Sequence, residues 1–140
     1  MDSTSLTHAF ASFGLFGLIW TIQLVHYPAF AFIEAAHWHH FHQKHSRNIT
    51  LIVFPLMLIE LLTAIQLIIE ARTPSHLVFL ACTTLTWTLT AAVFIPLHNS
   101  LSRHPEPQKI RRLINLNWTR TAIWTINTVA VFTAIFADKT

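Results

Sequence analysis

The sequence has little of what builds soluble domains, secreted miniproteins or fibrous chains. Only 11% of its 140 residues are charged, whereas an ordinary soluble domain carries about 25%. Two glycines exclude a collagen-like repeat, and the single Cys82 excludes a disulfide-stapled miniprotein, because one thiol cannot form an internal bridge. The nine lysines and arginines are scattered between apolar stretches, so nucleic acid is not an expected partner despite a pI near 9.6.

Long apolar runs make up most of the chain, which is 53% hydrophobic with a mean hydropathy of +0.49. A membrane-spanning helix needs about 20 mostly apolar residues, and the segments 9–33, 51–69, 77–97 and 116–136 meet that requirement. The first run is too long for a secretory signal peptide, so we expect it in the mature protein. The sequence therefore predicts an all-α integral membrane protein, a four-helix bundle with residues 1–140 as one domain in a lipid bilayer.

The basic residues between the runs predict the orientation in the membrane. Six lie in the two loops that follow the first and third runs: Lys44, Arg47, Arg103, Lys109, Arg111 and Arg112. The opposite side has only Arg72 and Lys139. Because cytoplasmic loops carry the excess of Lys and Arg, we expect both termini outside the cytoplasm, in a membrane such as the bacterial inner membrane.

Two ordinarily charged residues lie inside the runs, Glu60 and Arg120. Each costs about 2.5 to 3.5 kcal/mol at a helix centre on insertion scales, so each needs compensation. Helical rise places them at depths that differ by about 6 Å, which long side chains can bridge. We therefore expect a Glu60–Arg120 ion pair, which either takes part in chemistry or only fixes the helix arrangement.

Other polar groups and three prolines fall in the same half of the predicted bundle. Pro28, Pro55 and Pro96 each remove a backbone hydrogen bond and kink a helix. We expect a cavity open toward the cytoplasmic side and lined by Gln23, His26, Tyr27, Met57, Glu60, His98, Asn117 and Arg120. Gln23, His98 and Asn99 are candidates for holding a cofactor there.

Ten histidines suggest a transition-metal site, because imidazole binds iron, copper and zinc. The candidate ligands are His26, His42, His45, His98 and Glu60. Carboxylates are too scarce for a paired-carboxylate diiron centre. Haem between His26 and His98 fits less well, since the two lie at different heights, and a site without any cofactor is a further alternative.

The histidine-rich stretch 37–45 has a second interpretation that involves no metal. It is then an interfacial segment in which Trp38 and Phe41 anchor in the lipid headgroups and His37, His39 and His40 face water.

The ends of the third and fourth runs resemble a family of small membrane proteins. Pro96 is followed by Asn99, and Asn117 by Arg120, within Phe94-Ile95-Pro96-Leu97-His98-Asn99 and Asn117-Trp118-Thr119-Arg120. This pattern, with Phe54-Pro55-Leu56-Met57, resembles the four-helix anthrone-oxygenase-like family. The resemblance implies oxidation of an anthrone or related phenol by dioxygen without a conventional organic cofactor. His26, Glu60 and the histidine-rich stretch depart from the family pattern.

The first functional hypothesis is a membrane-embedded oxidoreductase that acts on a hydrophobic aromatic or quinone-like molecule. His26 or Glu60 is the expected general base, Arg120 and Asn117 hold the oxyanion, and Tyr27 and His98 orient the substrate. The alternatives are a metal-ion binding or transport protein and a non-catalytic membrane assembly subunit. Threonines on the outer faces suggest packing within the chain or in a homo-oligomer: Thr84, Thr88, Thr125 and Thr128.

Overall fold

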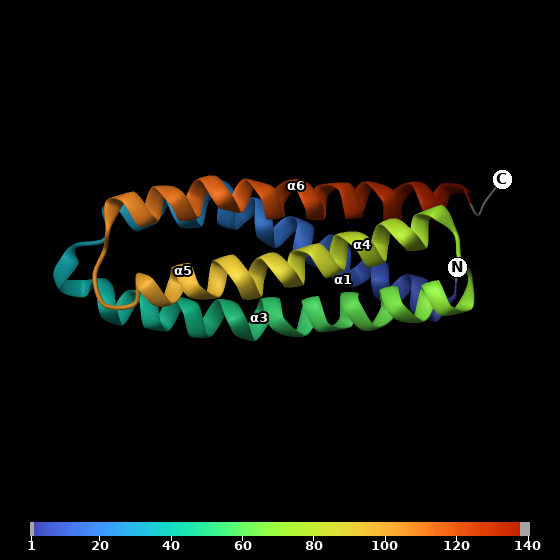
Figure 1. Cartoon of the computed structure of the whole chain (residues 1–140), viewed down its shortest axis with the longest axis horizontal. Helices are drawn as coiled ribbons and strands as arrows, with labels where there is room; N and C mark the ends of the chain where they lie inside the picture. The colour runs from blue at the N-terminus through green and yellow to red at the C-terminus, as the bar shows by residue number, and fades with distance from the viewer. Residues whose placement is uncertain (1, 138–140) are drawn as a thin grey trace.

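The computed structural model describes residues 2–137 as four long helical rods joined by short turns (Figure 1). The first rod comprises α1 (Ser3–Thr21), η1 (Ile22–His26), α2 (Tyr27–Ala29) and η2 (Phe30–Phe32), and the second is α3 (Ala35–Glu70). The third comprises α4 (Pro74–Leu89), η3 (Thr90–Phe94) and α5 (Ile95–Ser100), and the fourth is α6 (Pro107–Ala137). Lys139, used in predicting the orientation, lies outside the described residues.

Each rod is long and apolar enough to cross a membrane, which confirms the predicted all-α four-helix membrane bundle. The helices extend beyond the predicted spans. In particular, α3 begins at Ala35 rather than near residue 51, so the histidine-rich stretch 37–45 is the first part of a membrane helix. Trp38, His42 and His45 of this stretch are buried within the bundle.

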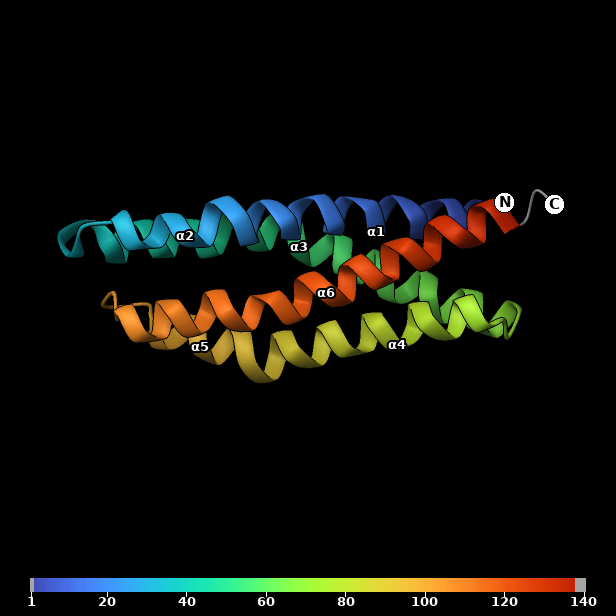
Figure 2. The same ribbon diagram turned by 90° about the horizontal axis from the view of Figure 1, so that it is seen from above.

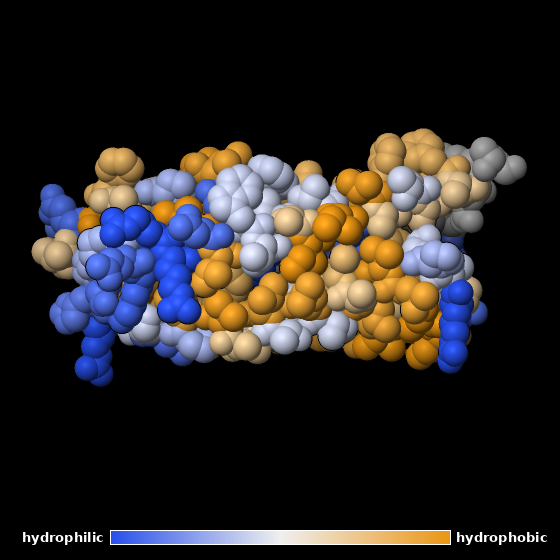
Figure 3. Space-filling model, turned by 45° about the horizontal axis from the view of Figure 1, so that its top comes forward, coloured by the Kyte–Doolittle hydropathy of each residue, from blue (hydrophilic) through white to orange (hydrophobic). Residues whose placement is uncertain are grey.

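The rods pack in a ring, in which α1 contacts α3 and α6, and α4 contacts the same two helices. Both chain termini and the α3–α4 turn lie at one end of the bundle, here called the terminus end (Figure 2). The turn between η2 and α3 and the loop between α5 and α6 lie at the other, the loop end. Hydrophilic side chains gather at the loop end, and apolar ones cover the middle (Figure 3).

Two π-helical turns accommodate two of the three helix prolines. In η1 the Tyr27 N–H bonds the Ile22 carbonyl, and in η3 the Ile95 N–H bonds the Thr90 carbonyl, each five residues back. Both π turns end two residues before a proline, Pro28 or Pro96, whose ring displaces the regular hydrogen bond. Pro55 lies within a continuous α3. Single π turns are frequent at functional sites.

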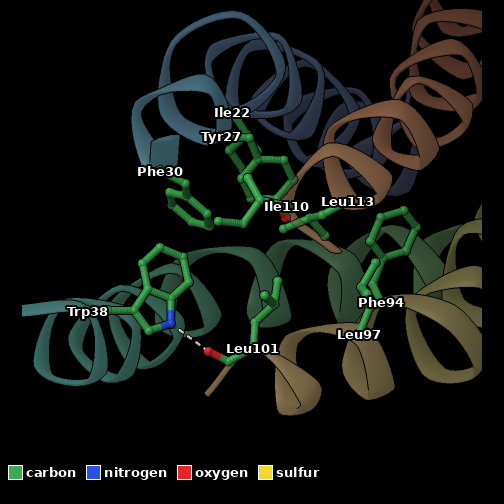
Figure 4. Packing of buried hydrophobic residues seen from close by; sticks show 9 residues of the cluster. All are labelled: Ile22, Tyr27, Phe30, Trp38, Phe94, Leu97, Leu101, Ile110 and Leu113. Carbon is green, nitrogen blue, oxygen red and sulfur yellow. Dashed lines mark hydrogen bonds between the residues drawn. The ribbon is translucent and has the colours of Figure 1, made fainter. Parts of the chain in front are cut away.

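The apolar core forms three clusters along the bundle. At the terminus end Ala9, Ala64, Leu67, Phe79 and Val131 pack together, and the middle cluster is Leu15, Ile19, Met57 and Trp124. The loop-end cluster is the largest: Ile22, Tyr27, Phe30, Trp38, Phe94, Leu97, Leu101, Ile110 and Leu113. Figure 4 shows its members converging from all four rods, with Trp38 bonded to the Leu101 carbonyl. Polar groups lie between and beside these clusters.

Candidate functional site

The main cavity lies between the middle cluster and the loop end and has a volume of about 570 Å³. Its inner wall is apolar and aromatic, with side chains from all four rods that include Leu15, Ile19, Ile22, Met57, Trp87, Phe94 and Trp124. Cavities of this size and composition bind small hydrophobic molecules. A cavity was predicted in this half of the bundle, and we call it the pocket.

The pocket opens sideways between two neighbouring rods. Its exposed lining residues lie on α3, where His39, Gln43, Thr50 and Phe54 are exposed, and on η3 and α5, where Ala91, Ile95 and Asn99 are exposed. Phe54 and Trp87 meet edge to face across the opening, with ring centres 5.9 Å apart. Phe54 and Ile95 are exposed apolar side chains on helices long enough to cross a membrane, so the opening is flanked by apolar surface.

A chain of polar side chains lies along the pocket wall. The Arg120 Nη2 donates to the Tyr27 hydroxyl at 3.3 Å, and that hydroxyl lies 3.1 Å from His98 Nε2. His98 Nδ1 lies 3.3 Å from His42 Nε2. The Tyr27 oxygen accepts from Arg120, so the hydroxyl proton of Tyr27 points to His98 Nε2. His98 Nε2 is then the acceptor nitrogen of the ring, which places the ring proton on Nδ1, where it points to His42. This polarity is assigned from the bonding pattern.

Arg120 reaches the pocket wall without a carboxylate partner. Its Nε and Nη2 donate to the Asn117 Oδ1 at 3.0 and 2.6 Å, and Asn117 in turn donates to Gln23. The guanidinium carbon lies 3.7 Å from the centre of the Phe94 ring. Within residues 2–137 the ion pairs are His37–Glu34 and Lys109–Glu106, and no group there accepts a hydrogen bond from Arg120 Nη1. The pocket therefore has a buried positive charge with a free donor.

The predicted Glu60–Arg120 ion pair is wrong. Glu60 is fully buried and accepts hydrogen bonds from Ser12, Asn127 and the indole of Trp124. Trp124 lies between the two charges, with its ring centre 5.8 Å from the Arg120 guanidinium carbon. The indole of Trp124, from α6, fills the space between the two charges and prevents the pair.

The pocket contains half of the side chains predicted to line it. Tyr27, Met57, His98 and Arg120 do so, together with Asn99. Gln23, His26, Glu60 and Asn117 lie outside its wall. Asn117, which accepts from Arg120, donates to Gln23, and Gln23 donates to the Ile114 carbonyl. These two amides therefore hold Arg120 in place from outside the pocket. The π turn in η1 puts Tyr27, and not His26, on the pocket side.

Four of the five predicted metal ligands do come together near the loop end. Besides the His42–His98 contact, His26 Nε2 lies 2.6 Å from His45 Nδ1, and the His45 and His98 rings are 6.2 Å apart. Glu60 is not among them, since its partners are those of the bundle middle. In the described part of the chain, no three His, Cys, Asp or Glu side chains have the arrangement of a metal site.

The interfacial interpretation of residues 37–45 is half correct. His37, His39 and His40 are exposed as predicted, and His39 bonds the Ser102 carbonyl. Trp38 does not anchor in the headgroups: it is fully buried and bonds the Leu101 carbonyl at 2.6 Å. Of the outer threonines, Thr125 accepts from Trp20 and Thr128 donates to Ser12, both within the chain, whereas Thr84 and Thr88 are exposed.

Sequence reasoning missed several residues of the interior. Phe94, Trp87 and Trp124 are pocket aromatics that hydropathy does not distinguish from core. Ser46 and Thr90 also line the pocket, and each has a buried hydroxyl that finds no partner among residues 2–137. The prolines were the available signal for Phe94 and Thr90, since both belong to the π turn before Pro96.

Comparisons with protein-family models, with curated proteins and with solved structures find no match to this chain.

Proposed function

We propose that the chain is a membrane-embedded oxidoreductase that binds a hydrophobic phenol, anthrone or quinone-like molecule in the pocket. The observation that carries this proposal is Arg120, a buried cation on an apolar wall with a free Nη1 donor and no carboxylate partner. A ligand with an ionisable oxygen supplies the missing negative charge. The stack of Arg120 on Phe94 fixes the direction from which that oxygen approaches.

The chemistry that fits is oxidation of the bound anion by dioxygen. In an anthrone the CH₂ carbon loses two hydrogens, one oxygen atom of dioxygen becomes its carbonyl oxygen, and the other leaves as water. The carbon is oxidised by four electrons and dioxygen is reduced by four. Side chains are needed for formation of the anion. This step places negative charge on the carbonyl oxygen opposite the CH₂ carbon, where Arg120 stabilises it.

The proton of the substrate leaves along the polar chain. Tyr27 takes it as it passes its own proton to His98 Nε2, and His98 Nδ1 faces His42 Nε2 near the pocket opening. These groups take the role that His26 and Glu60 have in the sequence-based hypothesis. His26 and Glu60 lie outside the pocket wall, so we do not assign them a part in the reaction.

The placement in the membrane follows from the basic loop end. We propose that the loop end, with Lys44, Arg47 and Arg103, faces the cytoplasm and that both termini face outward, as in a bacterial inner membrane. The pocket then opens into the cytoplasmic leaflet.

A metal centre is the second candidate, favoured by one distance. His42 Nε2 and His98 Nδ1 are 3.3 Å apart, about the separation of two ligands on one tetrahedral metal with bonds of about 2.0 to 2.1 Å. Iron, copper or zinc would be held by His42 and His98. Only these two nitrogens have that spacing, so the described residues fit a hydrogen-bonded relay better than a metal.

The test is turnover by the purified protein in lipid nanodiscs, supplied with an anthrone and dioxygen and freed of metals by chelation. We expect oxygen uptake and quinone absorbance to appear together. Arg120→Met should lower the rate about 100-fold, the effect of losing one oxyanion donor, while Arg111→Met, at an exposed position on the same helix, should leave it unchanged. Turnover that needs added metal favours the second candidate, and full activity in Arg120→Met contradicts the proposal.

A further inference from the structure

A second polar cluster lies in the terminus half of the bundle, away from the pocket. Two contacts between α1 and α3 form it: His8 Nδ1 lies 2.9 Å from Thr63 Oγ1, and Ser12 Oγ donates to Glu60 at 3.1 Å. His8 and Ser12 are one helical turn apart, as are Glu60 and Thr63, so the contacts are separated by about 6 Å of helical rise. All four side chains are buried.

The hydrogen bonds of Thr63 determine which nitrogen of His8 carries the proton. The Thr63 hydroxyl has one hydrogen, which it directs to the carbonyls of Ile59 at 2.7 Å and Glu60 at 3.1 Å. It therefore accepts from His8, whose Nδ1 is the donor. The other ring nitrogen, Nε2, is then an unprotonated acceptor. It is buried and has no hydrogen-bond partner within residues 2–137.

Two more buried atoms in this half lack partners. Asn127 Nδ2 donates to both Ser12 and Glu60, which leaves its Oδ1 without a donor, and the Thr83 hydroxyl is also unpartnered. Native buried polar atoms are rarely unsatisfied, so each of these needs a physical explanation. With His8 Nε2 and the Glu60 carboxyl, the cluster is rich in acceptors.

The groups around Glu60 leave its charge uncompensated. From α1, Ser12 donates to Glu60, and His8 lies one turn away from Ser12. From α6, Asn127 and Trp124 donate to it, and Arg120 lies on the other side of the Trp124 indole. From α4, Cys82 is close enough to interact electrostatically with Glu60. Neutral donors therefore hold the carboxyl, and a proton is the smallest species that removes its charge.

We propose that Glu60 and His8 together bind one exchangeable proton that comes from the aqueous phase at the terminus end. The His8–Thr63 and Ser12–Glu60 contacts lie one helical turn apart, so a proton on either group stays within the same buried cluster. The terminus end is the nearer aqueous face, because His8 lies five residues after the start of α1 at Ser3. The His8 ring packs on Phe79 with centres 4.7 Å apart, and Phe79 contacts the half-buried His76 at 5.8 Å. Trp124 lies between this site and the pocket, since it lines the pocket and donates to Glu60.

The experiment is infrared spectroscopy of the protein in nanodiscs, with the Glu60 carboxylic-acid band identified as the difference between wild type and Glu60→Gln. Between about pH 5 and pH 9, the range in which shifted carboxyl and imidazole groups titrate, we expect the band to appear on acidification. His8→Gln should move its midpoint by about one pH unit or more. Glu70→Gln, which changes an exposed carboxylate on the same helix, is the matched control and should move nothing.

Three results would overturn the proposal. They are a Glu60 band that does not change in this range, a midpoint that His8→Gln leaves in place, and a midpoint that follows sodium concentration when choline replaces sodium. If His8→Gln does not fold, Thr63→Val provides the same test, because it removes the acceptor that fixes the His8 tautomer.

Discussion

The indole N–H of Trp124 donates to Glu60 over 3.1 Å. The same indole ring lies 5.8 Å from the Arg120 guanidinium carbon, so Trp124 separates the two charges inside the bundle. As a result Glu60 is satisfied by neutral donors in the terminus half, and Arg120 keeps its charge for the pocket. A direct ion pair would neutralise Arg120 and remove its positive charge from the pocket wall.

Trp124→Phe should destabilise the bundle while leaving an aromatic ring beside Arg120. The change removes one hydrogen bond to a buried carboxyl, and hydrogen bonds to charged groups contribute about 1.5 to 3 kcal/mol. Unfolding by denaturant in detergent measures the loss. Trp118→Phe, at a position that is 45% exposed, should change stability little, and equal effects of the two substitutions would contradict the assigned role of Trp124.

Asn117→Asp should separate the fold of the protein from its proposed activity. Asn117 Oδ1 accepts from two nitrogens of Arg120, so an aspartate at this position keeps both bonds and supplies the missing carboxylate. The charge of Arg120 is then neutralised internally. We expect a folded protein whose affinity for an acidic phenol, measured by calorimetry, falls by about tenfold or more. Unchanged affinity in a folded variant would show that the charge of Arg120 does not bind the ligand.

Ala91→Trp should close the sideways opening of the pocket. Ala91 is an exposed lining residue in η3, where a large side chain points into the gap between η3 and α3 without displacing core. The association rate of a hydrophobic ligand, followed by stopped-flow fluorescence, should fall by about tenfold or more. Ala122→Trp adds the same side chain at an exposed position on α6 and should have no effect. Equal rates in both variants would exclude entry between these rods.

Trp38→Phe should loosen the loop end. The Trp38 indole donates to the carbonyl of Leu101 (Figure 4). Leu101 is the C-cap residue of α5, directly before the loop to α6. Loss of that bond leaves a buried carbonyl unsatisfied, at a cost of about 1 to 3 kcal/mol. Limited proteolysis should then cut the 101–106 loop faster than in wild type, while cleavage near the terminus end stays the same. A loop that resists protease as well as wild type does would contradict this role for Trp38.

Hydropathy was sufficient to predict the fold, because four long apolar runs in 140 residues leave no other way to bury them. The helix ends were less predictable. Residues 35–50 are polar by composition, yet they continue α3, since Trp38, His42 and His45 turn inward and pack against the other rods. The mean hydropathy of a window of residues does not reveal such a pattern, in which only one face of the helix is buried.

The site was predictable in its residue types but not in its partners. Tyr27, His98 and Arg120 were predicted to be polar residues in the same half of the bundle, and the structure brings them into contact. The facing direction of His26 depends on the π turn before Pro28, which has no strong sequence signature. His8 was missed because it lies near the chain start, where a single histidine is usually exposed; here it is buried against Thr63.

Arg120 is proposed to bind the anionic oxygen of a hydrophobic ligand. Binding of an alkyl-substituted nitrophenol tests this most directly, because the absorption spectrum of the probe distinguishes phenol from phenolate. At a bulk pH about one unit below the pKa of the free probe, the protein-bound probe should show the phenolate spectrum. Arg120→Gln should lose that spectrum while still binding the uncharged nitrobenzene analogue as wild type does. A phenolate spectrum that persists in Arg120→Gln, or a bound probe that stays neutral in wild type, would contradict the account.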